Sequence, residues 1–117
     1  MAASIIIRPV EEGRLDEWRQ FHAELMGSRR IEWAQSQRRR GITRQVVSLV
    51  SDGGRTLAVV FTEGRDPGAA LEALEDSADA FDVWLTERVA ALHGDPLDSE
   101  ITLDTAPRPG PWKGWRK

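Results

Sequence analysis

Two apolar runs separated by glycines are the clearest pattern in the chain, and they predict a β-hairpin within Thr43–Gly64. Asp52-Gly53-Gly54 lies between the runs, and glycine tolerates the positive φ angles that a two-residue turn requires. A turn at Gly53-Gly54 predicts the pairs Val50/Leu57, Ser48/Val59, Val46/Phe61 and Arg44/Glu63 on one face, and Leu49/Ala58, Val47/Val60 and Gln45/Thr62 on the other. Both faces of the hairpin are then apolar, so both need cover.

The remaining patterns predict two helices and two further strands. Ser4–Val10 contains three consecutive isoleucines, which is typical of a strand buried on both sides. Apolar residues spaced three and four apart predict a long helix over residues 13–40, with a potential interruption at Gly27-Ser28. The same spacing predicts a second helix over Gly68–Leu92, and Ile101–Thr105 is predicted as a last short strand.

The predicted order of elements is β-α-β-β-α-β, which is that of a ferredoxin-like α+β domain with a four-stranded antiparallel sheet and two helices on one face. Residues 1–106 would form this single domain. Residues 107–117 would form a Pro/Gly/Trp-rich tail that docks Trp112 and Trp115 over a groove. Helices cover only one face of the sheet, and each exposed Val, Leu or Phe side chain on the other forgoes about 1.5–3 kcal/mol. We therefore expect a homodimer with its sheets packed face to face.

Composition narrows the range of partners and compartments. The formal net charge of −3 gives no bulk attraction to nucleic acid or to an anionic membrane surface. The chain has no cysteine, which excludes disulfides and thiol chemistry, and with only two histidines a metal site is not expected. No apolar run approaches the roughly 20 residues of a membrane span, and the N-terminus lacks a signal-peptide pattern. We expect a cytoplasmic protein.

His22 is the strongest candidate for chemistry. It lies on the same helical stripe as Trp18 and Leu25, so its side chain should point towards the sheet. A neutral imidazole in that position can act as a general acid or base. The alternative, which is the more common situation, is a histidine at the edge of the core whose ring is satisfied by a backbone carbonyl.

Three tryptophans and one arginine are candidates for ligand binding. Trp18, Trp33 and Trp84 would suit the wall of a pocket for a flat apolar molecule, since such pockets are aromatic with few polar groups. The alternatives are that Trp18 belongs to the ordinary core and that Trp84 meets a partner subunit or the tail. Arg8, on the first strand, is placed to meet a carboxylate or an enolate, with a purely structural role as its alternative.

The passage Arg8-Pro9-Val10-Glu11-Glu12-Gly13, which leads into Leu15-Asp16-Glu17-Trp18, resembles the strand-to-helix entry of dimeric α+β barrel proteins. This superfamily includes antibiotic-biosynthesis monooxygenase-like and mutarotase-like groups. The segments Arg40-Gly41-Ile42 and Glu75-Asp76-Ser77 are similar to those of a small uncharacterised bacterial branch. The resemblance implies the fold and a cavity between sheet and helices, but it implies no single reaction.

The expected function is therefore the binding of a small apolar organic molecule in that cavity, with cofactor-independent monooxygenase, isomerase or cyclase activity as its enzymatic form. The alternative is a non-catalytic dimer that binds a metabolite or a protein partner. No cofactor is expected. Related proteins carry histidines near this part of the second helix, where this chain has Ala78, Ala80 and Phe81, which disfavours metal or haem chemistry.

Overall fold

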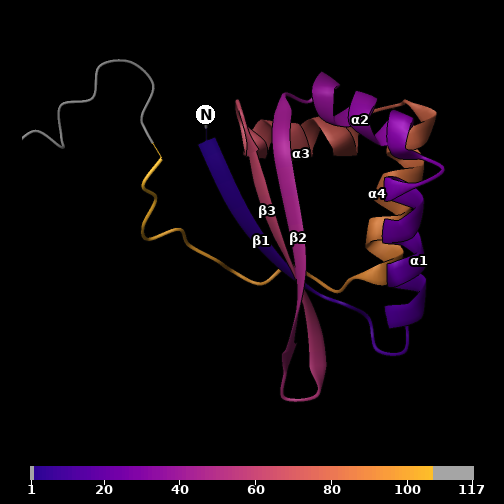
Figure 1. Ribbon diagram of the computed structural model, residues 1–117, viewed down its shortest axis with the longest axis vertical. Helices are drawn as coiled ribbons and strands as arrows, with labels where there is room; N and C mark the ends of the chain where they lie inside the picture. The colour runs from indigo at the N-terminus through magenta and orange to yellow at the C-terminus, as the bar shows by residue number, and fades with distance from the viewer. Residues whose placement is uncertain (1, 107–117) are drawn as a thin grey trace, which may run out of the picture.

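The computed structural model describes residues 2–106, which form one antiparallel sheet and four helices (Figure 1). The chain order is β-α-α-β-β-α-α. The elements are β1 (Ala2–Pro9), α1 (Leu15–Met26), α2 (Arg30–Arg39), β2 (Ile42–Asp52), β3 (Arg55–Gly64), α3 (Pro67–Asp76) and α4 (Ala80–Leu92). Among these residues, no helix combines the length and the apolar character needed to cross a membrane. The predicted docking of Trp112 and Trp115 lies outside the described residues.

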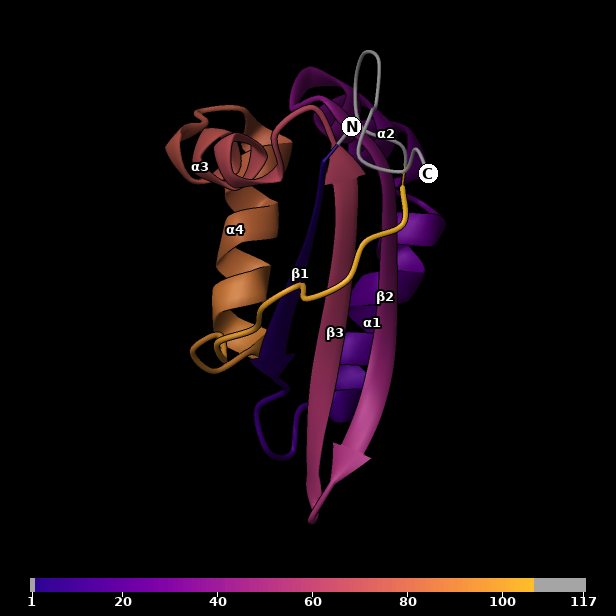
Figure 2. The ribbon, with the colours of Figure 1, turned by 90° about the vertical axis from the view of Figure 1, so that its left-hand side faces the viewer.

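The sheet has three strands in the order β1-β3-β2, all antiparallel. The helices lie on one side of it, and the segment that follows α4 passes to the other side (Figures 1 and 2). We call the side that faces the helices the inner face. The other side is the outer face, to which Val46 and Val50 belong.

The predicted hairpin is confirmed together with its register. Val50 pairs with Leu57, Val47 with Val60 and Arg44 with Glu63, as every other predicted pair does. The turn is made by two glycines with positive φ angles, 56° at Gly53 and 88° at Gly54. That pair of left-handed residues matches the right-handed twist of the strands it connects, so this short turn fixes the pairing as far as Arg44 and Glu63, beyond which the register shifts.

Each predicted long helix is two helices; the interruption predicted at Gly27-Ser28 is confirmed, and the unbroken second helix is wrong. The first ends at Gly27, whose φ of −119° and ψ of −104° lie outside the helical region. The second is interrupted at Ser77, whose ψ is 139°. A new helix then begins at Asp79, whose carboxylate accepts hydrogen bonds from the backbone N–H of Phe81 at 3.0 Å and of Asp82 at 3.3 Å. Asp79 is thus a helix cap and not a residue of a continuous acidic face.

The predicted strand Ile101–Thr105 is absent from the described residues, so the fold is α+β but not the four-stranded ferredoxin-like sheet. The chain that precedes it meets the free edge of β1 at separate points, where the Gly94 N–H donates to the Pro9 carbonyl at 2.9 Å and the Leu97 N–H donates to the Ile7 carbonyl at 2.7 Å. Two residues later the Ser99 hydroxyl donates to the Ile5 carbonyl, which a backbone N–H would use in a continuing ladder. A side chain therefore competes with strand pairing at the point where the fourth strand should form.

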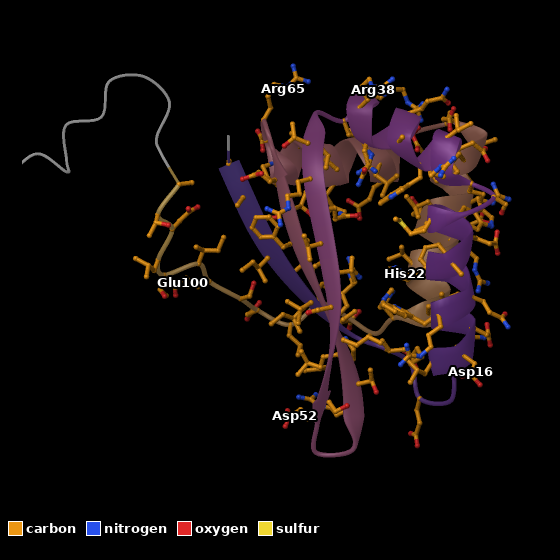
Figure 3. The ribbon with its side chains drawn as sticks, viewed as in Figure 1. Asp16, His22, Arg38, Asp52, Arg65 and Glu100 are labelled. Carbon is orange, nitrogen blue, oxygen red and sulfur yellow. The ribbon has the colours of Figure 1, made fainter. Side chains whose placement is uncertain are left out.

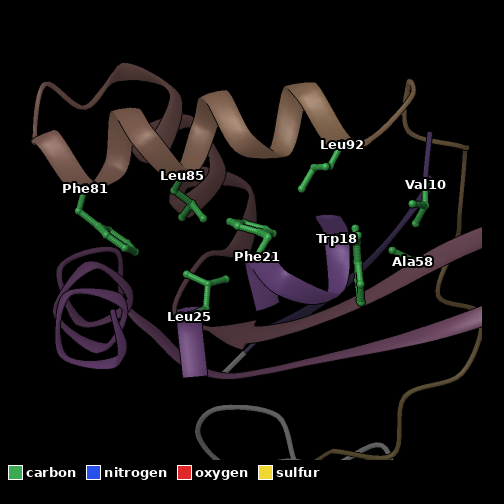
Figure 4. Packing of buried hydrophobic residues seen from close by; sticks show 8 residues of the cluster. All are labelled: Val10, Trp18, Phe21, Leu25, Ala58, Phe81, Leu85 and Leu92. Carbon is green, nitrogen blue, oxygen red and sulfur yellow. The ribbon is translucent and has the colours of Figure 1, made fainter. Parts of the chain in front are cut away.

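The fully buried core lies mainly between helices, not between helices and sheet. Its members are Val10, Trp18, Phe21, Leu25, Ala58, Phe81, Leu85 and Leu92 (Figure 4). Six of the eight come from α1 and α4, whereas β3 contributes only the small side chain of Ala58. The inner face of the sheet therefore does not fill the space in front of it.

Candidate functional site

A cavity of about 650 Å³ occupies the space between the inner face of the sheet and the helices. Its walls are largely apolar, with Ile6, Val47 and Val60 on the sheet side and Phe21 and Leu25 on the helix side. From Ala58 to Thr62 the cavity follows β3 for about 13 Å, taking a strand rise of about 3.3 Å per residue. It is thus elongated along the strands.

His22 lies in the cavity wall, on the side of α1 that faces the sheet (Figure 3). Its ring stacks on Trp18 with centroids 3.8 Å apart and meets the edge of Phe21 at 5.2 Å. Burial, together with the nearby His93, lowers the pKa of His22 to about 4. The imidazole is therefore neutral at pH 7.

His93 is a functional candidate that the sequence analysis did not select. Its Nε2 accepts the indole N–H of Trp18 at 2.9 Å, and its Nδ1 lies 2.9 Å from the Val89 carbonyl. A ring that accepts at Nε2 carries its proton on Nδ1, so the two contacts fix one tautomer. Burial lowers the pKa of His93, the Val89 hydrogen bond opposes this, and the charge of Arg8 adds to the lowering. The local sequence gives one indication that His93 faces the cavity, because His93 follows the cavity-lining Val89 by one helical turn.

The other predicted residues divide between the cavity and the helix layer. Arg8 lines the cavity beside His93, and Trp18 and Trp33 line it from α1 and α2. Trp84 is not among the lining residues. It packs between helices, 5.6 Å from both Phe21 and Phe81, with the Arg29 guanidinium 3.9 Å above its ring. The structure thus brings Arg8, Trp18, His22 and Trp33 to one cavity and leaves Trp84 outside it.

A second polar cluster joins α2 to α4 next to the cavity. The Asp82 side chain, only 3% exposed, accepts hydrogen bonds from the Ser36 hydroxyl at 2.6 Å and the Ser77 hydroxyl at 2.7 Å. Arg39 Nη2 lies 3.2 Å from each of its oxygens. Burial would raise the pKa of Asp82, but these hydrogen bonds and the charge of Arg39 outweigh it and leave the pKa below its usual range.

Within residues 2–106 no group of three or more metal-ligating side chains converges. In comparisons with known proteins, no family model and no curated protein matches the chain. The resemblance to dimeric α+β barrel proteins therefore stays a prediction. What the site itself defines is a ligand-sized apolar cavity with histidines and arginines in its wall.

Proposed function

We propose that the protein binds a small, largely apolar organic molecule in the cavity between its sheet and its helices. One observation carries the proposal, the cavity of about 650 Å³ with walls of aliphatic and aromatic side chains. Pockets that bury small organic ligands have volumes of about 300–1,000 Å³ and combine apolar walls with a few placed polar groups. The Trp18 ring and the inner face of β3 supply such walls here.

A second candidate is a cofactor-independent enzyme, such as a monooxygenase, isomerase or cyclase, in which His22 moves a proton of the bound molecule. A neutral imidazole in the cavity wall supports it. The pKa of about 4 weighs against it, because a general base works best with a pKa near the working pH. We therefore rank binding first and proton transfer second.

The proposal includes a homodimer formed through the outer face of the sheet. Val46 is 42% exposed and Val50 is 43% exposed on that face, although both lie on a regular strand in the middle of an apolar pattern. A second copy would bury them. If instead a different protein covers this face, the molecule is the interaction module considered above, and the cavity is secondary.

Binding is tested with N-phenyl-1-naphthylamine, a neutral apolar dye that fluoresces on leaving water. We expect the wild type to bind it and Val60→Phe, which puts a ring into the cavity, to lose at least about tenfold in affinity. Val59→Phe is the matched control, because Val59 lies on the same strand but on the outer face.

Urea unfolding confirms that each variant is folded, and Val60→Ala, which enlarges the cavity, should keep the dye bound. No binding to the wild type, or equal binding by Val60→Phe and Val59→Phe, contradicts the proposal.

A further inference from the structure

The charged side chains that line the cavity have one sign. The whole chain has 19 acidic and 16 basic residues, yet the lining contains four arginines and no aspartate or glutamate. The arginines are Arg8, Arg30, Arg40 and Arg44, of which Arg44 has its guanidinium 6.0 Å from the centroid of the Phe61 ring, on the outer face. A low-dielectric cavity surrounded by cations attracts anions even when the net charge of the protein is negative.

Among these arginines, Arg40 has a side-chain nitrogen whose hydrogen bonding is incomplete. It follows α2, and its Nε donates to the Ser36 hydroxyl at 3.2 Å. Its Nη2 is buried and has no hydrogen-bond partner among residues 2–106. A buried donor without a partner destabilises the folded state, and more so when it is charged, so such a group is rarely kept without a use.

The nearest carboxylate does not satisfy Arg40. The carboxylate oxygens of Asp82 already accept hydrogen bonds from Ser36, Ser77 and Arg39. Burial lowers the pKa of Arg40, Asp82 raises it and Arg39 lowers it further, but a guanidinium remains protonated at neutral pH in any case. Arg40 is therefore a cation beside the cavity with one N–H donor group that has no acceptor among residues 2–106.

Two neutral polar groups lie at the same end of the cavity. Gln45 and Thr62 face each other across β2 and β3, and both line the cavity; Gln45 lies a few residues after Arg40 along the chain. Gln45 Nε2 donates to Thr62 Oγ1 at 3.1 Å, which leaves the Thr62 hydroxyl proton free to donate to another acceptor. The rest of the cavity, along Val60, Val47 and Phe21, is apolar.

We propose that the ligand of this cavity is an amphipathic organic acid, whose carboxylate is bound by the guanidinium of Arg40 at the Gln45–Thr62 end and whose apolar body lies along β3 towards Trp18. This inference rests on the proposed binding function and adds the chemical class of the ligand. Charge-assisted hydrogen bonds from a guanidinium are among the strongest available to a carboxylate. The elongated cavity suits a chain or a narrow ring system attached to that head group.

The test compares decanoate with decanol, which differ in the head group alone, by displacement of N-phenyl-1-naphthylamine at pH 7. We expect the wild type to bind decanoate roughly tenfold more tightly than decanol. Arg40→Met, which removes the guanidinium and keeps an unbranched apolar stem, should abolish that preference while leaving decanol binding unchanged. Arg38→Met is the matched control, since Arg38 is an exposed residue of α2 outside the lining.

Equal binding of decanoate and decanol by the wild type overturns the inference. So does a preference that survives Arg40→Met or is lost in Arg8→Met instead. In these cases the dye still binds, and the proposed function stands. If the dye itself does not bind the wild type, the proposed function fails first. We expect Arg40→Met to fold, because it removes a buried unmatched charge, and the wild-type comparison decides the ligand class without it.

Discussion

At the scale of single residues, the molecule depends on contacts between side chains that are far apart in the sequence. Asp82 meets Ser36, 46 residues earlier, and Trp18 meets His93, 75 residues later. Helical spacing predicts that Trp18 and His22 share a face, and their rings do stack. No local pattern predicts the partners of Asp82 or the role of His93, because neither spacing nor propensity carries information about which helices pack together.

Asp82→Asn should destabilise the protein by on the order of 3 kcal/mol, because it leaves Arg39 without its buried charge partner and disturbs both serine hydrogen bonds. Urea unfolding at pH 7 measures this change. Asp79→Asn is the control, since asparagine also caps a helix and the Asp79–Arg39 pair at 3.4 Å is exposed. Equal losses in the two variants would contradict the role of the Asp82 cluster.

The lowered pKa of Asp82 also predicts how the free energy of unfolding changes at acid pH. Its pKa is lower in the folded protein than in the unfolded chain. The unfolded chain therefore takes up the proton first, and the stabilisation present above the usual carboxyl range is lost as the pH falls through the folded pKa. Unfolding curves from pH 5 downwards should be steeper with pH for the wild type than for Asp82→Asn.

His22 predicts a separate effect at milder pH. Its pKa falls from 6.5 to about 4 on folding, so between these values the unfolded chain binds a proton that the folded protein does not. The free energy of unfolding should therefore decrease as the pH is lowered from about 6.5 to about 4. His22→Gln should flatten this dependence in part, with the remainder due to His93, whose pKa is also lowered. An unchanged slope in the variant would show that the ring is not buried as described.

At the scale of elements, the hairpin turn and the break in the first predicted helix follow from local sequence, whereas the break in the second predicted helix does not. Gly53-Gly54 sets the turn and hence every pair of the hairpin, so the register follows from local sequence. Gly27-Ser28 marks the first break, whereas Ser77 falls inside a continuous apolar stripe, where period alone indicates one helix. The missing fourth strand has a cause that is local in space, the Ser99 hydroxyl on the Ile5 carbonyl, but not in sequence.

Two glycines, one in the hairpin turn and one in α3, give predictions of opposite sign. Gly54 has a φ of 88°, so Gly54→Ala should cost roughly 1–2 kcal/mol in free energy of unfolding from backbone strain. Gly68 lies in α3, where an added Cβ would meet only Asp66 Oδ1 at an ordinary 3.6 Å. Gly68→Ala should therefore be neutral or stabilise by up to about 1 kcal/mol. Thermal unfolding of both variants checks the pair, and a loss at Gly68 equal to that at Gly54 would argue against the turn geometry.

At the scale of the whole molecule, the arrangement of helices and sheet determines where the exposed sheet face and the cavity lie. Four helices cover the inner face of a three-stranded sheet, and most of the buried core lies between the helices themselves. The prediction that a cavity lies between sheet and helices agrees with this arrangement. The sequence shows that the strands are apolar on both faces, but not how many strands there are, because strand number depends on pairing at the β1 edge.

Replacing both Val46 and Val50 by arginine should convert the proposed dimer to a monomer, since two charges on each outer face would oppose each other across the interface. Size-exclusion chromatography with light scattering at micromolar concentration measures the mass. Val83→Arg is the control, because Val83 is 41% exposed but lies on α4, away from the sheet. A monomeric wild type would exclude the dimer directly.

The position of the tryptophans has an optical consequence. The chain has five tryptophans and no tyrosine, so its intrinsic near-ultraviolet emission comes from indole alone. Two of these chromophores, Trp18 and Trp33, lie in the cavity wall, and Trp18 is stacked on His22. A molecule that enters the cavity changes the surroundings of the emitting rings, and a proton on His22 places a cation against one of them. The protein thus carries its own label for occupancy and for protonation, readable in a single spectrum.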